Sequence, residues 1–116
     1  MSRSLELSPE PVSRMLCVKV VPCAQIGGES YIASLSRMYP HIPLIASGGV
    51  NQQNASKFIL AGAMALGVGR ELIPAEAILH RQVDRIGELA RRFVGFVKNG
   101  RDHLAARKAR RMAIDE

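Results

Sequence analysis

Cys17-Val18-Lys19-Val20-Val21-Pro22 is the stretch of sequence that decides the fold. It is an apolar run of the length of a buried β-strand, it ends at a proline, and it contains a single charged residue, Lys19. Burial disfavours the ammonium form of a lysine, so we expect Lys19 to be a nucleophilic amine. On this pattern alone, a charge that protects an edge strand from aggregation is the alternative.

Two more short apolar runs end in glycine-rich turns. The first is followed by Ser47-Gly48-Gly49-Val50-Asn51, and the second is Ala65-Leu66-Gly67-Val68-Gly69. Glycines directly after a strand are typical of turns that bring backbone N–H groups close to a phosphate, although a tight turn without a ligand is the alternative. Together with Lys19, these turns indicate Schiff-base chemistry on a phosphorylated keto compound.

The three apolar runs alternate with stretches of helical periodicity. This order predicts an α/β fold with a parallel sheet, whose crossover connections place the helices on one side. Three β/α units leave two sheet edges and one face uncovered, so we expect the C-terminal three units of a TIM (β/α)8 barrel, an incomplete barrel with parallel strands and outer helices. We expect strands over 16–21, 43–46 and 64–68, and helices over 8–15, 29–38, 51–62 and 74–98, the last ending at Asn99-Gly100.

Length and composition exclude several classes of protein. The chain has 116 residues, which is enough for one domain. It has no apolar run of ~18 residues that could cross a membrane, and its first residues lack the apolar core of a secretory signal. The two cysteines, Cys17 and Cys23, suit neither a disulfide framework nor a zinc site, and we expect Cys23 to be a small buried apolar residue. We therefore expect a cytoplasmic protein without a metal or a membrane partner.

Basic residues gather towards the C-terminal end. The chain has a net charge of +6, and the stretch from Arg91 to Arg111 holds eight basic residues and one acid, Asp102. We expect residues 99–116 to be a basic tail with a solvated, fraying helix. Nucleic acid is not an expected partner, because no aromatic residues are interleaved with these charges; a salt-sensitive nucleic-acid surface is the alternative.

The segment from Val18 to Gly28 resembles the strand that holds the Schiff-base lysine of the 2-keto-3-deoxy-6-phosphogluconate (KDPG) and 4-hydroxy-2-oxoglutarate (KHG) aldolases. The segment from Ile45 to Asn51 resembles the next strand and phosphate-binding turn of this family, and the segment from Ala61 to Pro74 resembles its last strand. The resemblance divides the chain into an unmatched lead-in over 1–16, an aldolase-like half-barrel over 17–98 and the basic tail over 99–116.

This resemblance implies a class I aldolase that needs no metal and no cofactor. The amine of Lys19 would condense with the keto carbon of pyruvate, and the protonated imine would take up the electron pair of the carbon–carbon bond that breaks. The substrate would be a small keto acid, in most cases phosphorylated, and family members are typically homotrimers. The resemblance implies one catalytic residue, Lys19, and five substrate-binding residues, Pro22, Ser47, Gly48, Gly49 and Gly69.

The sequence departs from the family pattern in two ways. The family's acid/base glutamate lies on earlier strands that this sequence does not contain. Arg70 stands where relatives often carry a small polar residue, and we do not expect it to be essential. We therefore expect the lysine and phosphate-binding half of an aldolase, which assembles with a missing N-terminal half or with further copies of itself; a truncated non-catalytic remnant that at most binds phosphate or a partner half is the alternative.

Overall fold

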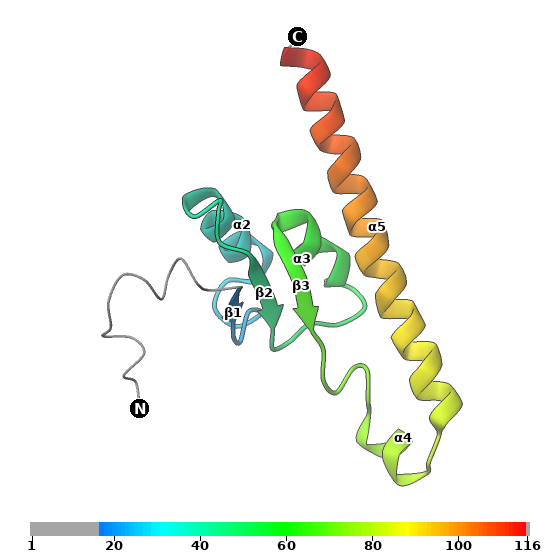
Figure 1. The fold of residues 1–116 in the computed structure, drawn as a ribbon. Helices are drawn as coiled ribbons and strands as arrows, with labels where there is room; N and C mark the ends of the chain where they lie inside the picture. The colour runs from blue at the N-terminus through cyan, green and yellow to red at the C-terminus, as the bar shows by residue number, and fades with distance from the viewer. Residues whose placement is uncertain (1–16, 116) are drawn as a thin grey trace.

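A computed structural model describes residues 17–115 of the chain (Figure 1). Its centre is a three-stranded parallel sheet in the order β1-β2-β3. The strands are β1 (Val18–Val20), β2 (Leu44–Ser47) and β3 (Ala63–Gly67). The helices are α2 (Gly28–Met38), α3 (Ala55–Ala61), α4 (Ala75–Leu79) and α5 (Val83–Asp115). The lead-in over 1–16 and the short helix expected over 8–15 lie outside the described residues.

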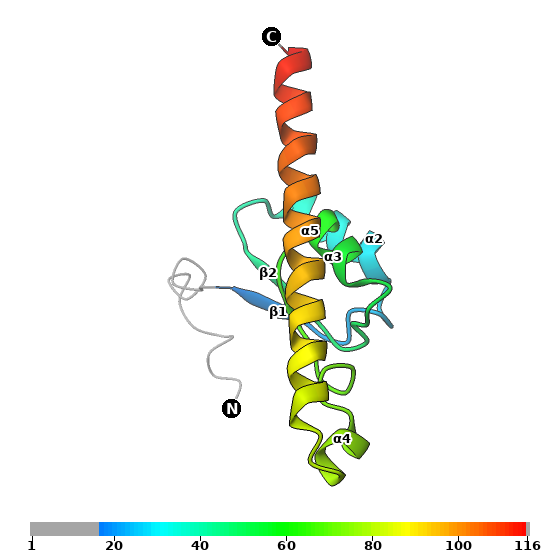
Figure 2. The same ribbon diagram turned by 90° about the vertical axis from the view of Figure 1, so that its right-hand side faces the viewer.

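The two faces of the sheet differ. Val20, Leu44 and Ala46 point to one face and are between 0% and 7% exposed. Helices α2 and α3 cover this face, as the two perpendicular views show (Figures 1 and 2). The residues at the intervening positions belong to the opposite face, which no described element covers. The helices therefore lie on one side, as expected, in an open sheet rather than a closed one.

An aliphatic core lies between the sheet and the helices. Its largest fully buried side chains include Ile32 of α2 and Phe58 of α3, which are 0% and 1% exposed. Helix α5 adds Phe93, whose ring meets that of Phe96 edge to face with centroids 6.0 Å apart. The core thus joins α2, α3 and α5 to the buried face of the sheet.

Most expected elements are confirmed, with shifts of one to four residues at their ends. Helix α2 and all three strands form where the apolar pattern places them. Helix α3 begins at Ala55 instead of directly after Asn51, because residues 52–54 form a separate turn. Within the described residues, no helix is long and apolar enough to cross a membrane.

The helix expected over 74–98 begins where we expected it, but it is interrupted and its C-terminal end is wrong. The chain forms the short helix α4 and then turns at Arg81, whose φ of 52° is incompatible with an α-helix, before α5 begins. Helix α5 then continues through Gly100, where we expected it to end. A Cβ atom at Gly100 would lie 2.9 Å from Cβ of Ile59 on α3, so this glycine allows the two helices to approach each other.

The C-terminal part of α5 extends beyond the rest of the molecule (Figure 1). The side chains over 105–114 are all exposed. Before this exposed part, the guanidinium of Arg101 donates a hydrogen bond of 2.8 Å to the carbonyl oxygen of Met64 in β3. The basic tail is therefore continuous with α5 up to Asp115, and its part over 105–114 is the exposed end of the helix.

Candidate active site

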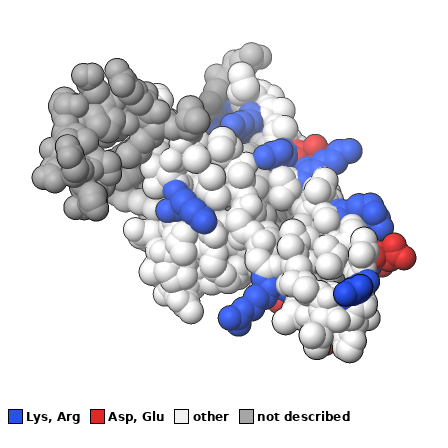
Figure 3. Space-filling view, turned by 60° about the horizontal axis from the view of Figure 1, so that its bottom comes forward, with Lys and Arg blue, Asp and Glu red and all other residues white. Residues whose placement is uncertain are grey.

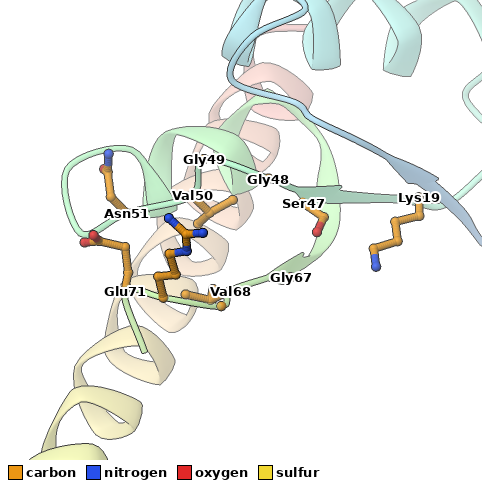
Figure 4. Close-up of a pocket in the computed structure, with 11 residues that line it drawn as sticks. Lys19, Ser47, Gly48, Gly49, Val50, Asn51, Gly67, Val68 and Glu71 are labelled. Carbon is orange, nitrogen blue, oxygen red and sulfur yellow. The ribbon is translucent and has the colours of Figure 1, made fainter. Parts of the chain in front are cut away.

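One cleft of about 660 Å³ opens at the carboxyl-terminal ends of the strands (Figure 4). This is the edge at which α/β proteins bind their ligands, because the loops that follow the strands converge there. The cleft is lined by residues from all three strands and the turns after them: Lys19, Ser47, Gly48, Gly49, Val50, Asn51, Gly67, Val68, Gly69, Arg70 and Glu71.

Lys19 and Ser47 extend from the uncovered face of the sheet. Lys19 is paired with Ile45 in the parallel register, and Ser47 lies two residues further along the same strand, so all three share one face. Their side chains point to the same side of the sheet (Figure 4), and both line the cleft. An amine and a hydroxyl are thus brought together at the cleft.

The prediction that Lys19 is buried is wrong for this chain by itself. Lys19 is exposed, because β1 is an edge strand and its face of the sheet has no second layer within residues 17–115. Lys19 therefore lies at the cleft, as a site residue would. It is also exposed on an edge strand, as a charge that prevents aggregation would be. A covering segment would be needed to dehydrate the amine.

Gly48 and Gly49 form a turn that only glycine fits. Their φ angles are 86° and 87°, in the left-handed region that disfavours side chains. A Cβ atom at Gly48 would lie 2.8 Å from Cα of Pro22, and one at Gly49 would lie 2.5 Å from Cβ of Ala24. Close packing against the segment after β1 therefore requires both glycines, whether or not they also contact a ligand.

The same packing places the other residues around this turn. Pro22 does not line the cleft; it lies behind Gly48. Cys23 is 0% exposed, and its thiol donates a hydrogen bond of 3.2 Å to the carbonyl oxygen of Gly48. Burial raises the pKa of the Cys23 thiol above its ordinary value, which keeps it protonated. As expected, Cys23 is a buried packing residue.

Two asparagines brace the turn between β2 and α3, and the sequence pattern did not show this. The Oδ1 atom of Asn51 accepts hydrogen bonds of 2.9 Å from the N–H groups of Gln53 and Asn54. In return, the Oδ1 atom of Asn54 accepts the N–H of Asn51 at 2.8 Å. The spacing Asn-x-x-Asn after a strand is the signal that could have found this pair, whereas a helix-cap pattern singles out Asn51 alone.

The turn after β3 supplies the remaining wall. The carbonyl oxygen of Gly69 accepts hydrogen bonds from the N–H groups of Leu72 and Ile73 at 3.0 and 2.9 Å. A Cβ atom at Gly69 would have no other atom within 4 Å, so there is free space beside this residue. Arg70, which we did not expect to be essential, also lines the cleft, and so does Glu71.

The charges around the cleft suit an anionic ligand. Its lining includes the cationic Lys19 and Arg70 and a single carboxylate, Glu71. A view onto the carboxyl-terminal ends of the strands shows more lysine and arginine than acidic side chains, spread over the face in separate groups (Figure 3). Within residues 17–115, no group of three or more histidine, cysteine or acidic residues is placed to hold a metal ion.

The family model for KDPG and KHG aldolases matches residues 13–89, more than half of the chain. The chain belongs to this aldolase family. The match confirms the resemblance seen in the motifs, and it covers the cleft, including Lys19 and both glycine turns. This family is one of carbon–carbon lyases that act on small molecules.

A solved structure supports the fold of this family member. It is described as a "cube-shaped, highly porous protein cage designed by fusing symmetric oligomeric domains", and it matches with a TM-score of 0.74 and 25% sequence identity. The match covers 89% of this chain and 37% of that chain, so the sequence spans well under half the length of the solved protein. No curated protein matches the sequence.

Proposed function

We propose that this chain carries the lysine and phosphate-binding half of a class I aldolase. The intact enzyme cleaves 2-keto-3-deoxy-6-phosphogluconate or 4-hydroxy-2-oxoglutarate to pyruvate and an aldehyde. The observation that supports this most is the grouping of the Lys19 amine, the Ser47 hydroxyl and the glycine turns in one cleft at the carboxyl-terminal ends of the strands. The family match supports the same chemistry.

In the proposed reaction, Lys19 attacks the keto carbon of the substrate, and loss of water gives an imine. Cleavage of the neighbouring carbon–carbon bond releases the aldehyde, as a base removes the proton of the substrate hydroxyl and the protonated imine takes up the electron pair as an enamine. Protonation of the enamine and hydrolysis of the imine release pyruvate and regenerate the Lys19 amine. Ser47 donates a hydrogen bond to the pyruvyl carboxylate.

The phosphate of a phosphorylated substrate would lie between the two glycine turns. Gly48, Gly49 and Gly69 line the cleft, and backbone N–H groups at such positions can approach an anion without side chains in the way. The side chain of Arg70 would add a positive charge at the same end of the cleft. Pro22 supports this site indirectly through its contact with Gly48.

The base in this reaction would come from outside the present sequence. Within residues 17–115, both edges of the sheet are open and the Lys19 face is uncovered, which is the surface that further strands of a (β/α)8 barrel would cover. A missing N-terminal half, or further copies of the chain in a homo-oligomer, would supply this layer and with it the acid/base glutamate. Covering the face would also shield the Lys19 amine from water.

Trapping with pyruvate tests this proposal. Sodium borohydride reduces the imine between Lys19 and pyruvate to a stable adduct, which peptide mapping by mass spectrometry locates. We expect the adduct on Lys19 and not on Lys57, a lysine of α3 outside the cleft that serves as the matched control within the same chain. Equal labelling of both lysines would show that the cleft does not activate Lys19.

The exposure of Lys19 favours a second candidate, a non-catalytic remnant that at most binds phosphate or a partner half. A chain that is folded by circular dichroism but gains no adduct at Lys19 would support it. Adding a polypeptide with the missing half of the family fold distinguishes the two candidates further. We expect turnover to appear only in that mixture if the aldolase proposal is correct.

A further inference from the structure

The side chain of Asn54 joins two peptide groups of the turn that lines the cleft. Its Nδ2 atom donates a hydrogen bond of 3.0 Å to the carbonyl oxygen of Gly49, and its Oδ1 atom accepts the N–H of Asn51 at 2.8 Å. These two groups lie on either side of Val50, so one carboxamide holds the backbone both before and after that residue. Asn54 itself does not line the cleft, whereas Gly49, Val50 and Asn51 do.

Fixing a carbonyl group also fixes the direction of the N–H group in the same peptide. The two point in opposite directions across a trans peptide, so a Gly49 carbonyl held towards Asn54 turns the N–H of Val50 away from Asn54. The preceding peptide is held in a similar way. The carbonyl oxygen of Gly48 accepts hydrogen bonds from the Ala24 N–H and the Cys23 thiol, both at 3.2 Å, which directs the N–H of Gly49 away from these partners.

The two N–H groups so directed have no partner among the described residues. Within residues 17–115, neither the Gly49 N–H nor the Val50 N–H donates a hydrogen bond to an acceptor of the protein. Successive free N–H groups that follow residues with positive φ are typical of backbone concavities that bind anions. Without a fixed carbonyl, the peptide after Gly49 could rotate, because glycine accepts many backbone conformations.

We propose that Asn54 is a positioning residue for the anion subsite. By holding the Gly49 carbonyl, it aims the N–H of Val50 into the cleft, where this group donates to an anionic oxygen of the substrate. Asn51 stabilises the arrangement, because its Oδ1 atom accepts the backbone N–H of Asn54. The inference rests on the proposed function for the identity of the substrate, but the anion subsite can be tested without turnover.

Titration of the whole chain with inorganic phosphate tests the proposal. The backbone amides of Gly49 and Val50, followed by 1H–15N correlation spectra, report on the site directly. Asn54→Asp retains the acceptor for the Asn51 N–H and removes the donor to the Gly49 carbonyl, and Asn54→Ser removes that donor without adding charge. Because the side chain of Asn54 makes no capping hydrogen bond to α3, both variants should fold.

We expect both variants to bind phosphate about tenfold more weakly than the wild-type chain, the effect of losing one well-placed donor to an anion. Gln53→Glu is the matched control, because it adds the same charge as Asn54→Asp on an exposed neighbouring side chain and should change the affinity less than about threefold. Trapping of pyruvate on Lys19 should be the same in all variants.

Two results would overturn the proposal. In the first, the Asn54 variants bind phosphate as tightly as the wild type. In the second, phosphate does not shift the Gly49 and Val50 amides of the wild-type chain at all. Failure of pyruvate trapping with phosphate binding intact would instead count against the aldolase proposal and leave Asn54 as the positioning residue of an anion site.

Discussion

Replacing Gly49 by alanine should destabilise the fold by about 2–5 kcal/mol. Gly49 has a φ of 87°, a region that costs a residue with a side chain roughly 1–2 kcal/mol. The new Cβ atom would also lie 2.5 Å from Cβ of Ala24, and such overpacking costs typically ~1–3 kcal/mol. Since small domains have a total stability of only about 5–15 kcal/mol, this loss should be easy to measure.

The assay is urea denaturation followed by far-ultraviolet circular dichroism, with Gly69→Ala as the matched control. Gly69 lines the same cleft, but a Cβ atom there would have no other atom within 4 Å, so this variant should stay within about 0.5 kcal/mol of the wild type. An unchanged midpoint for Gly49→Ala, or equal losses in both variants, would refute the idea that contact with Ala24 makes glycine necessary.

Three more predictions concern the core and α5. Gly100→Ala should lower the free energy of unfolding by about 1–3 kcal/mol in the same assay, despite the better helix propensity of alanine, because its Cβ would meet Ile59 at 2.9 Å; a stabilised variant would contradict this. Deleting residues 105–116 should reduce the helical signal without lowering the urea midpoint, since the side chains over 105–114 are exposed. The raised pKa of Cys23 in the fold means that the unfolded thiol loses its proton first, so stability should fall as the pH rises through the thiol's ordinary range, and Cys23→Ala should not show this component.

Local patterns were enough to predict the sheet and α2. Each strand is a short apolar run bounded by glycine or proline, and this signal does not depend on the rest of the fold. The boundaries of the last helix could not be predicted in the same way. Gly100 looks like a helix end in the sequence, but its role is to let α5 approach Ile59, a residue 41 positions earlier in the chain.

The convergence of the glycine turns could be predicted from the sequence, because the carboxyl-terminal ends of parallel strands lie at one edge of the sheet, and these turns line one cleft. Their role as a site stays a prediction. The sequence could not decide between a buried and an exposed Lys19, since this depends on whether another layer covers that face. The role of Asn54 depends on two hydrogen bonds to backbone groups whose directions only the folded turn defines.

Helix α5 also determines what can be attached to this protein. It starts near the edge of the sheet where the cleft opens and runs towards the opposite end of the molecule, so its C-terminus lies far from the cleft (Figure 1). At 1.5 Å per residue, the ten exposed residues over 105–114 lengthen the helix by about 15 Å. A second domain fused to the C-terminus would begin at that distance, on the side away from the cleft.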